Sequence, residues 1–315
     1  MQGYDWLTAA ARAGTPYHFR HKTPSRHNLI GVAVLTAIAG GMAILLAAAR
    51  STPGWVYVPI AGAGFGFLYY PLLAIVVHEA SHGMMFLSAD PRRRRRWNRI
   101  IGWACAIPFG IHYRRHWEAG HLTHHVHPLE ADDPQAFNRA TGRRLAAVLA
   151  LLLLVPGAAL VHRFAFKRRT GFGGSSCSVF VLFAALWTVI LTAAVSGSGW
   201  KTALALAYGL QVLAALNQIK GALEHGGAVA FDPERLLRSR STLVAWRLWL
   251  PMFYVTIYHF EHHLNYAVPW YDLPRYHRAV RALVPTALQA DIFNVDLVAQ
   301  LAGRKGRIAR APETA

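Results

Sequence analysis

The chain has 315 residues, of which 54% are hydrophobic, and it carries a formal net charge of +18. Its long apolar runs contain almost no charged residues, which excludes an ordinary soluble domain and indicates an integral membrane protein. Nucleic-acid-binding proteins are also basic, but in proteins with membrane spans Lys and Arg gather in the cytoplasmic loops, near anionic lipid. We therefore expect membrane lipid as a partner and no nucleic acid.

The first apolar run begins near Asn28, after a polar and basic stretch. It lacks a small-residue cleavage site, so we interpret it as a membrane anchor and not as a removable signal peptide. The two cysteines, Cys105 and Cys177, form neither a CxxC pair nor a disulfide framework. The sequence therefore encodes no iron–sulfur or rubredoxin-type centre.

Four apolar runs are long enough to cross a bilayer, which takes about 20 helical residues. Short turns at residues 50–54 and 197–200 join them into two helical hairpins. The predicted spans are residues 29–49, 55–77, 178–198 and 202–222.

A fifth apolar run, residues 145–161, contains Val155-Pro156-Gly157 in its middle and is followed by the basic triplet Lys167-Arg168-Arg169. A crossing here would carry that triplet to the far side of the membrane. We therefore place the run in the interface or as a re-entrant broken hairpin. The prediction is an all-α integral membrane protein forming one domain over residues 1–315, with a cytoplasmic helical cap from residues 78–177 and 223–315.

Three histidine clusters stand at, or just beyond, the cytoplasmic ends of these spans. On a helix, spacings of three and four residues place side chains on one face. Imidazole is a common ligand for iron, copper, nickel and zinc, so eight such rings are enough to hold more than one metal ion. The clusters are His78-Glu-Ala-Ser-His82, His121-Leu-Thr-His124-His125 and His259-Phe-Glu-His262-His263.

The order HxxxH, HxxHH, HxxHH resembles the membrane fatty acid desaturase and hydroxylase superfamily, which includes alkane monooxygenases and carotenoid ketolases. The resemblance covers roughly residues 70 to 280. In that superfamily each histidine cluster is called a histidine box. Asp133-Pro134 stands eight residues after His125 and is similar to the Asp-Pro that closes the family's second box. Pro269 and Leu273-Pro274 resemble the segment that follows the third box. Glu224-His225-Gly226 ends the last span, where relatives often carry one further metal-ligating histidine.

This resemblance implies two non-haem iron ions held mainly by histidine, with dioxygen as co-substrate and an apolar or acyl chain as the substrate that loses hydrogen. No electron-transfer segment is fused to the chain, so a separate donor such as ferredoxin is implied. Richness in Ala, Arg and Gly suggests a bacterial source with a GC-rich genome, which would place the chain in the inner membrane. In the four-span arrangement the basic loops place the metal cap on the cytoplasmic side. The ligands carried over are His78, His82, His121, His124, His125, His225, His259, His262 and His263.

Other polar residues are expected to support the ligands or to lie elsewhere. A ligating ring normally donates its second N–H to a carboxylate or carbonyl, and the available carboxylates are Glu79, Glu118, Asp132, Asp133, Glu224 and Glu261. The spacing of three flanking histidines does not match the family pattern: His112, His116 and His127. Five more have no cluster partners and are expected at the surface or the interface: His18, His21, His27, His162 and His277.

Two departures from the family pattern bear on the reaction. The first box has three intervening residues, as in ketolases, where acyl-CoA desaturases commonly have four. Those enzymes also carry an asparagine one turn before the extra histidine, where this chain has Gly221, with Asn217 one turn further back. We expect a fatty acid or acyl-lipid desaturase, with a hydroxylase or ketolase of the same superfamily as the alternative.

Two other classes of protein remain alternatives. His78-Glu79-Ala-Ser-His82 satisfies HExxH, the helix of zinc proteases in which glutamate is the general base. An intramembrane protease of this kind would use only two of the histidines. A metal transporter or storage protein would place its ligands near mid-membrane, whereas these clusters lie at the ends of the spans.

Overall fold

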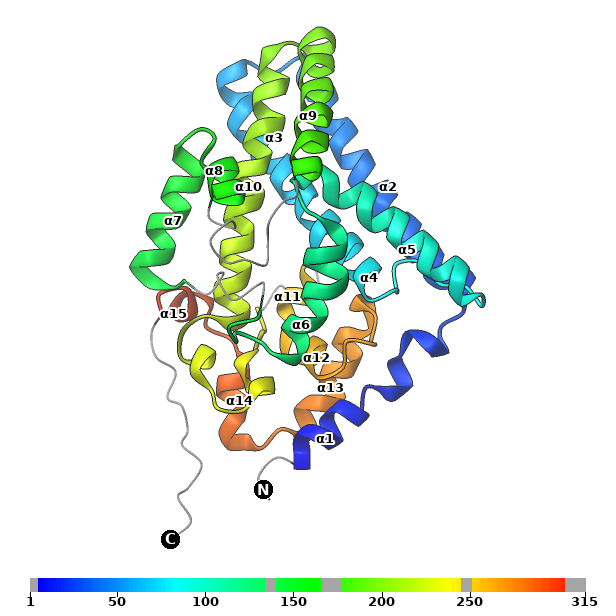
Figure 1. Cartoon of the computed structure of the whole chain (residues 1–315). Helices are drawn as coiled ribbons and strands as arrows, with labels where there is room; N and C mark the ends of the chain where they lie inside the picture. The colour runs from blue at the N-terminus through cyan, green and yellow to red at the C-terminus, as the bar shows by residue number, and fades with distance from the viewer. Residues whose placement is uncertain (1–4, 134–139, 166–176, 245–250, 304–315) are drawn as a thin grey trace. The chain divides into compact units, whose positions relative to one another are not determined.

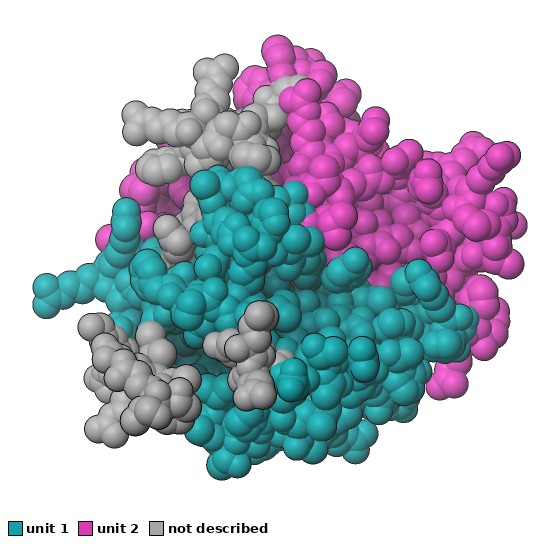
Figure 2. Space-filling view, turned by 60° about the horizontal axis from the view of Figure 1, so that its bottom comes forward, with its two compact units in different colours: residues 1–22, 123–146, 218–315 teal, residues 23–122, 147–217 magenta. Residues whose placement is uncertain are grey.

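The computed structural model describes residues 5–133, 140–165, 177–244 and 251–303 and is predominantly helical (Figure 1). Pro134 and the basic triplet at 167–169 lie outside these residues. The chain forms two compact units, shown in different colours in Figure 2. The first comprises residues 1–22, 123–146 and 218–315, and the second comprises residues 23–122 and 147–217.

Four helices among the described residues are long and apolar enough to span a membrane, which confirms the four predicted spans. Each begins one to five residues earlier than expected, and all four end within four residues of the predicted end. The second contains α3 (Gly54–Pro71), the π-helical segment η3 (Leu72–Val77) and α4 (His78–Ser81). The four are α2 (Pro24–Ala48), Gly54–Ser81, α9 (Cys177–Ser198) and α10 (Trp200–His225).

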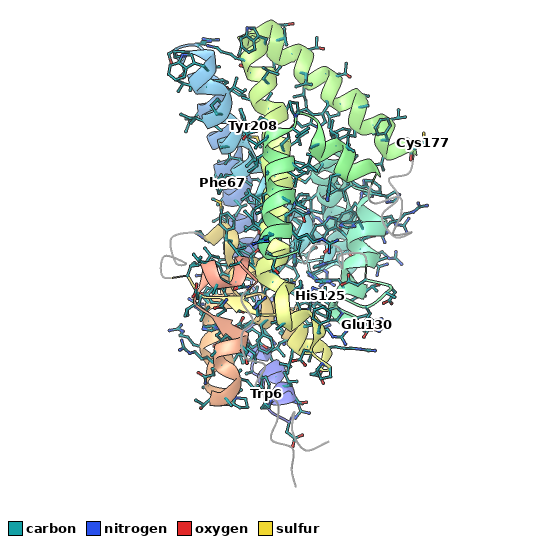
Figure 3. The ribbon with its side chains drawn as sticks, turned by 90° about the vertical axis from the view of Figure 1, so that its left-hand side faces the viewer. Trp6, Phe67, His125, Glu130, Cys177 and Tyr208 are labelled. Carbon is teal, nitrogen blue, oxygen red and sulfur yellow. The ribbon has the colours of Figure 1, made fainter. Side chains whose placement is uncertain are left out.

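Small residues allow α3 and α10 to approach closely within the second unit. A Cβ atom at Gly62 or Gly66 would collide with Tyr208 or Val212 of α10, respectively, and one at Gly209 would collide with Phe65. Tyr208 is labelled on α10 in Figure 3. Close contact of small residues is a main source of helix association in lipid, because lipid tails are as apolar as the side chains. The glycines therefore determine how these two spans pack.

The fifth apolar run is broken where the sequence predicts it. It forms α7 (Gly142–Leu154) and α8 (Ala158–Ala165), and Gly157 between them has a φ of +78° that favours glycine. The Gln211 side chain of α10 accepts a hydrogen bond from Gly157 N at 2.8 Å and donates to Leu152 O at 3.0 Å. Backbone groups at the break thus have hydrogen-bond partners. A break inside a bilayer would require such partners, because no water is available there. The place of this hairpin relative to the bilayer stays a prediction.

The second unit also contains α5 (Pro91–Ala106), whose first turn is capped by Asp90, the acceptor of a 2.8 Å hydrogen bond from Arg92 N. Cys105 and Cys177 are both free, as expected. A second π-helical segment, η5 (Arg114–Ala119), precedes α6 (Gly120–Val126), the helix on which the division between the units falls.

The first unit is built around α1 (Asp5–Arg12), α12 (His259–Leu264) and α13 (Leu273–Leu283). Its core includes Leu7, Phe260 and Val280, and Tyr276 Oη donates to Ala10 O at 2.8 Å. Two short parallel strands, β1 (Ser241–Thr242) and β2 (Phe293–Asn294), pair beside this core. The remaining helices of this unit are α11 (Tyr254–Ile257), α14 (Thr286–Ile292) and α15 (Leu297–Leu301).

Single turns of 3-10 helix connect these elements. They are η1 (Thr15–Tyr17), η2 (Phe19–His21), η4 (Ile107–Phe109), η7 (Gly227–Phe231), η8 (Arg235–Arg238), η10 (Pro251–Phe253) and η11 (Trp270–Asp272).

The α3–α10 contact predicts the effect of enlarging one glycine. Gly66→Leu should destabilise the protein by about 1–3 kcal/mol or more, because the new side chain meets Val212 and the backbone of α10. Gly40→Leu on α2 is the matched control, since no atom lies within 4 Å of a Cβ there. Thermal unfolding in detergent, followed by size-exclusion chromatography, measures the difference. Equal unfolding temperatures for the two variants would contradict this account of the packing.

Candidate metal centre

Four buried histidines of the first unit come together from three separate elements. His124 lies on α6, His225 is the last residue of α10, and His259 and His263 lie on α12. One ring nitrogen from each can be chosen so that all four lie within 4.8 Å of one another. Imidazole nitrogens bind metals at about 2.0–2.1 Å, so two ligands on opposite sides of an ion are about 4.2 Å apart. The group therefore has the dimensions of a single metal site.

Hydrogen bonds orient three of these rings through Nδ1. His124 Nδ1 donates to Asp133 Oδ2 at 2.9 Å, and His225 Nδ1 donates to Arg238 O at 2.7 Å. His259 Nδ1 lies 3.4 Å from Glu224 Oε1 and 3.3 Å from Val255 O. Commitment of Nδ1 to an oxygen leaves the Nε2 lone pair for a metal, which is the usual arrangement around histidine ligands.

The fourth ring, His263, has a different environment. Both of its nitrogens are buried, and neither has a hydrogen-bond partner among the described residues. A buried polar group without a partner costs about 1–3 kcal/mol. Coordination of a cation by one of these nitrogens would offset that cost, so the donor set fits a metal.

Burial also sets the charge of these rings. Burial lowers the pKa of His259 and His263 well below the usual value, and the neighbouring imidazoles lower it further. Both rings are therefore neutral at physiological pH. A neutral ring offers a lone pair, which metal binding requires.

The loop after α6 is shaped to hold Asp133. Besides His124, Asp133 Oδ2 accepts a 2.7 Å hydrogen bond from Leu129 N. Leu129 has a φ of +64°, which is uncommon for a residue with a side chain, and such strain tends to occur at functional sites. We attribute the strained turn to the need to place this carboxylate against His124.

Two more histidines of the first unit lie beside this group. The rings of His125 and His262 are 4.6 Å apart between centroids, and His125 is 4.5 Å from His263. Both residues are buried.

The second unit contains a separate group of three histidines. His78 Nε2 lies 3.2 Å from His82 Nε2 and 3.3 Å from His121 Nε2. His78 begins α4, His82 follows the end of α4, and His121 is the second residue of α6. Three imidazole nitrogens thus converge at the end of the second span, as the HxxxH and HxxHH patterns predict.

Both helices that carry this group are preceded by a π-helical segment, which the sequence analysis did not find. The η3 segment ends immediately before His78, and η5 ends immediately before α6. A π turn adds a residue to a helix and rotates everything after it by about 100°; such turns are frequent at functional sites. Pro71 has no backbone N–H to donate to the helix and stands just before η3. This proline is the sequence feature that could have indicated the irregular turn.

Residues 238–242, which were not predicted from the sequence, bond the helices that carry His225 and His259. Arg240 Nε donates to Leu223 O at 3.2 Å, and its guanidinium also bonds Gly226 O, so it caps the carbonyl end of α10 next to His225. Burial lowers the pKa of Arg240 to about 10, which leaves it charged at neutral pH. Ser241 Oγ donates to the Glu261 carboxylate of α12 and accepts from Phe260 N at 3.1 Å. The sequence feature that could have indicated this role is the alternation Arg238-Ser-Arg-Ser241, which comes soon after a predicted span.

Five of the six predicted supporting carboxylates divide into two sets, and the sixth, Glu79, is buried on α4 beside His78 in the sequence. Asp133 and Glu224 lie against histidines of the four-membered group. Asp132 pairs with His127 at 2.9 Å, Glu118 pairs with Arg99 at 2.7 Å, and Glu261 pairs with His277.

The structure corrects the expectation for two single histidines. His277 is buried and bonds Glu261, and His27 is buried with Nε2 at 2.5 Å from Met84 O. Both were expected at the surface or interface. Their partners lie far away in sequence, so no local spacing could reveal them.

Residues 53–293 match the model of one protein family, described as fatty acid desaturase. The chain belongs to the fatty acid desaturase family. A comparison with curated proteins gave no match. The matched range includes all three histidine boxes, His225 and three of the four candidate spans. This fatty acid desaturase family member is therefore a membrane oxidoreductase of desaturase or hydroxylase type.

Removal of one ring of the four-membered group should remove metal. His263→Ala is expected to lower the bound metal per chain, because that ring is buried in the group without another partner among the described residues. His21→Ala is the control, since this ring is exposed and belongs to none of the possible metal-binding groups among the described residues. Elemental analysis of the purified proteins measures the loss. Full metal content in His263→Ala would contradict the assignment.

The His124–Asp133 hydrogen bond predicts a smaller effect. Asp133→Asn should weaken metal binding by about 10–100-fold, because loss of such an orienting partner typically has that cost. Asp132→Asn, which changes the neighbouring carboxylate beside His127, should leave affinity unchanged. Competition with a chelator of known affinity compares the two variants, and equal affinities would remove the orienting role from Asp133.

Proposed function

We propose that this protein binds two non-haem iron ions and uses dioxygen to oxidise a C–H bond of an apolar or acyl chain. Desaturation is the reaction we put first, and hydroxylation or ketolase-type oxidation by the same centre is the alternative. The observation that carries the proposal is the group of four buried histidines in a member of the fatty acid desaturase family, with three of the rings oriented through Nδ1.

The first iron is assigned to His124, His225, His259 and His263, the group that lies within one unit. The second is assigned to the three-histidine group of the second unit, His78, His82 and His121. His125 and His262 of the first unit are the two remaining candidate ligands.

The residues perform three tasks in this proposal. Buried, neutral imidazoles supply lone pairs and leave the ions their full positive charge. Asp133, the Arg238 carbonyl and the Val255 carbonyl keep the rings oriented. Burial excludes water from the centre, which suppresses side reactions. Iron, when bound, supplies the dioxygen chemistry that side chains alone cannot perform.

The zinc protease alternative accounts for fewer residues. It would use His78, His82 and Glu79 and give no role to the buried group around His263. A transporter would need ligands along a path through the membrane, but His78 and His225 stand at the ends of their candidate spans. We therefore favour the oxidoreductase.

We further propose that the metal centre faces the cytoplasm at a bacterial inner membrane and takes electrons from a separate donor such as ferredoxin. Residues 92–96 are all arginine at the beginning of α5, and four of the five are exposed. Such a cluster is typical of a cytoplasmic segment near anionic lipid headgroups.

The proposed function is tested by turnover in proteoliposomes with ferredoxin, its reductase and dioxygen, followed by mass spectrometry of the lipid extract. A product lighter by about two mass units indicates desaturation, and one heavier by about sixteen indicates hydroxylation. His124→Ala should abolish either product, while His127→Ala should retain it. Two irons per chain are expected; one zinc with peptide cleavage, or full activity of His124→Ala, would overturn the proposal.

A further inference from the structure

Two charged residues stand near the end of the apolar helix α10, beside the four-membered histidine group. Lys220 Nζ lies 2.5 Å from Glu224 Oε2, one turn further along the helix. The other carboxylate oxygen of Glu224, Oε1, lies 3.4 Å from Nδ1 of His259. His259 Nε2, on the far side of that ring, lies 2.9 Å from His225 Nε2. An ammonium, a carboxylate and a ring of the group thus follow one another within the first unit.

Both charges are directed into the protein. The side chain of Lys220 is 14% exposed, and that of Glu224 is 1% exposed. A lysine near the end of a span ordinarily extends its ammonium towards the headgroups, but Lys220 bonds inward to Glu224. A buried charge must have a partner of opposite sign, so each of these residues requires the other.

The stability of α10 does not explain the pair. Glu224 is the residue before the last of this helix, where the carbonyl end of the helix disfavours a negative charge. Lysine four residues before glutamate is also the weaker of the two orders for such a pair. Local rules therefore oppose a glutamate at this position, and its contact with His259 is the gain that offsets them.

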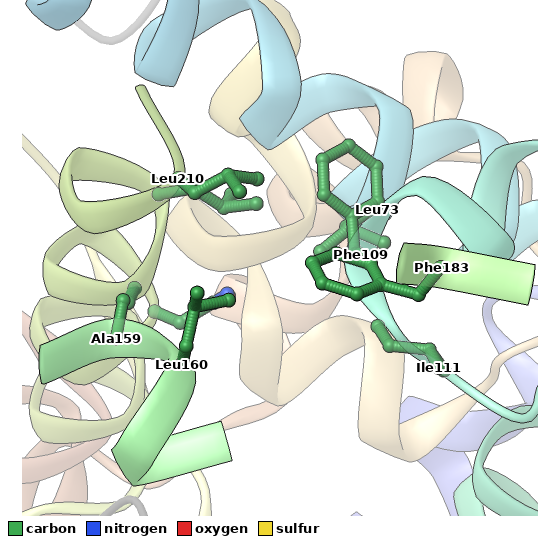
Figure 4. A pocket seen from close by; sticks show the side chains of 10 residues that line it. Leu73, Phe109, Ile111, Ala159, Leu160, Phe183 and Leu210 are labelled. Atoms are coloured by element: carbon green, nitrogen blue, oxygen red, sulfur yellow. The ribbon is translucent and has the colours of Figure 1, made fainter. Parts of the chain in front are cut away.

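The pair has no part in the cavity of the second unit either. That cavity, of ≈ 90 Å³, is lined by ten residues, of which only Asn217 is polar (Figure 4). Lys220 and Glu224 are not among them.

The charge of Lys220 also reaches the rings of α12. After burial and the neighbouring imidazoles, it is one of the causes that lower the pKa of His259 and His263. The ammonium therefore lies within electrostatic reach of the histidine group as well as in contact with Glu224.

We propose that Lys220 is a positioning residue of the metal centre, which holds the Glu224 carboxylate beside His259 Nδ1 and so strengthens this ring as a ligand. The inference rests on the proposed function for the presence of a metal at the four-membered group. A carboxylate behind a ligating ring raises its basicity. Val255 O, at 3.3 Å from the same Nδ1, is a neutral oxygen and does not supply that charge. Without Lys220, nothing of opposite charge would keep the carboxylate at this ring.

Metal binding without turnover tests the proposal. Full-length protein in detergent is loaded with Co²⁺, whose visible absorption responds to its ligands, and is titrated with a chelator of known affinity. Lys220→Met should weaken Co²⁺ binding about tenfold, the lower end of the range for loss of an orienting partner, and should shift the absorption band. Lys220→Arg, which keeps the charge, should retain both the affinity and the band.

Lys201→Met is the matched control. Lys201 is the other lysine of α10, near the beginning of the helix, and its Nζ donates to Thr52 O at 2.7 Å. This variant should bind Co²⁺ as the wild type does. Wild-type affinity in Lys220→Met, or an equal loss in the two methionine variants, would overturn the proposal.

A double substitution shows whether Lys220 acts through Glu224. Glu224→Gln alone should weaken Co²⁺ binding, and addition of Lys220→Met should change it by less than about twofold, because no carboxylate remains to be held. Losses that add in the double variant would contradict a positioning role. The double variant leaves no buried charge unpaired, so it decides the matter if Lys220→Met alone does not fold. Wild-type affinity in the double variant would overturn the proposal.

Failure of the proposed function gives a different result. Weaker Co²⁺ binding by Lys220→Met, in a protein whose wild type yields no oxidised product, would overturn the proposed function alone. Oxidised product from the wild type, with unchanged Co²⁺ affinity and absorption in Lys220→Met, would overturn this inference alone.

Discussion

The site depends on one constraint: a histidine can bind a metal only through the lone pair of a neutral ring that points in the right direction. Burial keeps His259 and His263 neutral by lowering the pKa of each ring. Orientation comes from oxygens behind the rings, which engage Nδ1 of His124 and His225 and lie near that of His259. The strained turn at Leu129 holds the Asp133 carboxylate in position, and the Arg240 cap holds the end of α10 next to His225.

A related constraint acts on the spans: in an apolar medium, backbone and side-chain polar groups must find hydrogen-bond partners inside the protein. Gln211 supplies hydrogen bonds to the backbone at the break between α7 and α8, and so attaches this hairpin to α10. Glycines at 62, 66 and 209 let α3 and α10 pack closely. The span that begins with α3 ends in His78–Ser81, and α10 ends in His225, so packing of the spans and placement of the histidines are linked.

Much of this arrangement could be predicted from local patterns. Uninterrupted apolar length predicted the four spans, and Pro156-Gly157 predicted the break in the fifth run, because both effects act along the chain itself. The π-helical segments before His78 and before α6 were not predicted, since a π turn depends on packing around the helix. His27 and His277 were misplaced because Met84 O and Glu261, their partners, are brought to them only by folding.

By itself, the sequence determined the family, the membrane location and the nine candidate histidines, because apolar length and the spacing of ligands are properties of the linear chain. Only the tertiary structure decided which rings converge, and that Asp133 and Glu224, and not Glu118, Asp132 or Glu261, lie against rings of the four-histidine group. It also decided that residues 238–242 join α10 to α12. The physical reason is that hydrogen bonds of this kind join residues distant in sequence, and their partners exist only once the helices have packed.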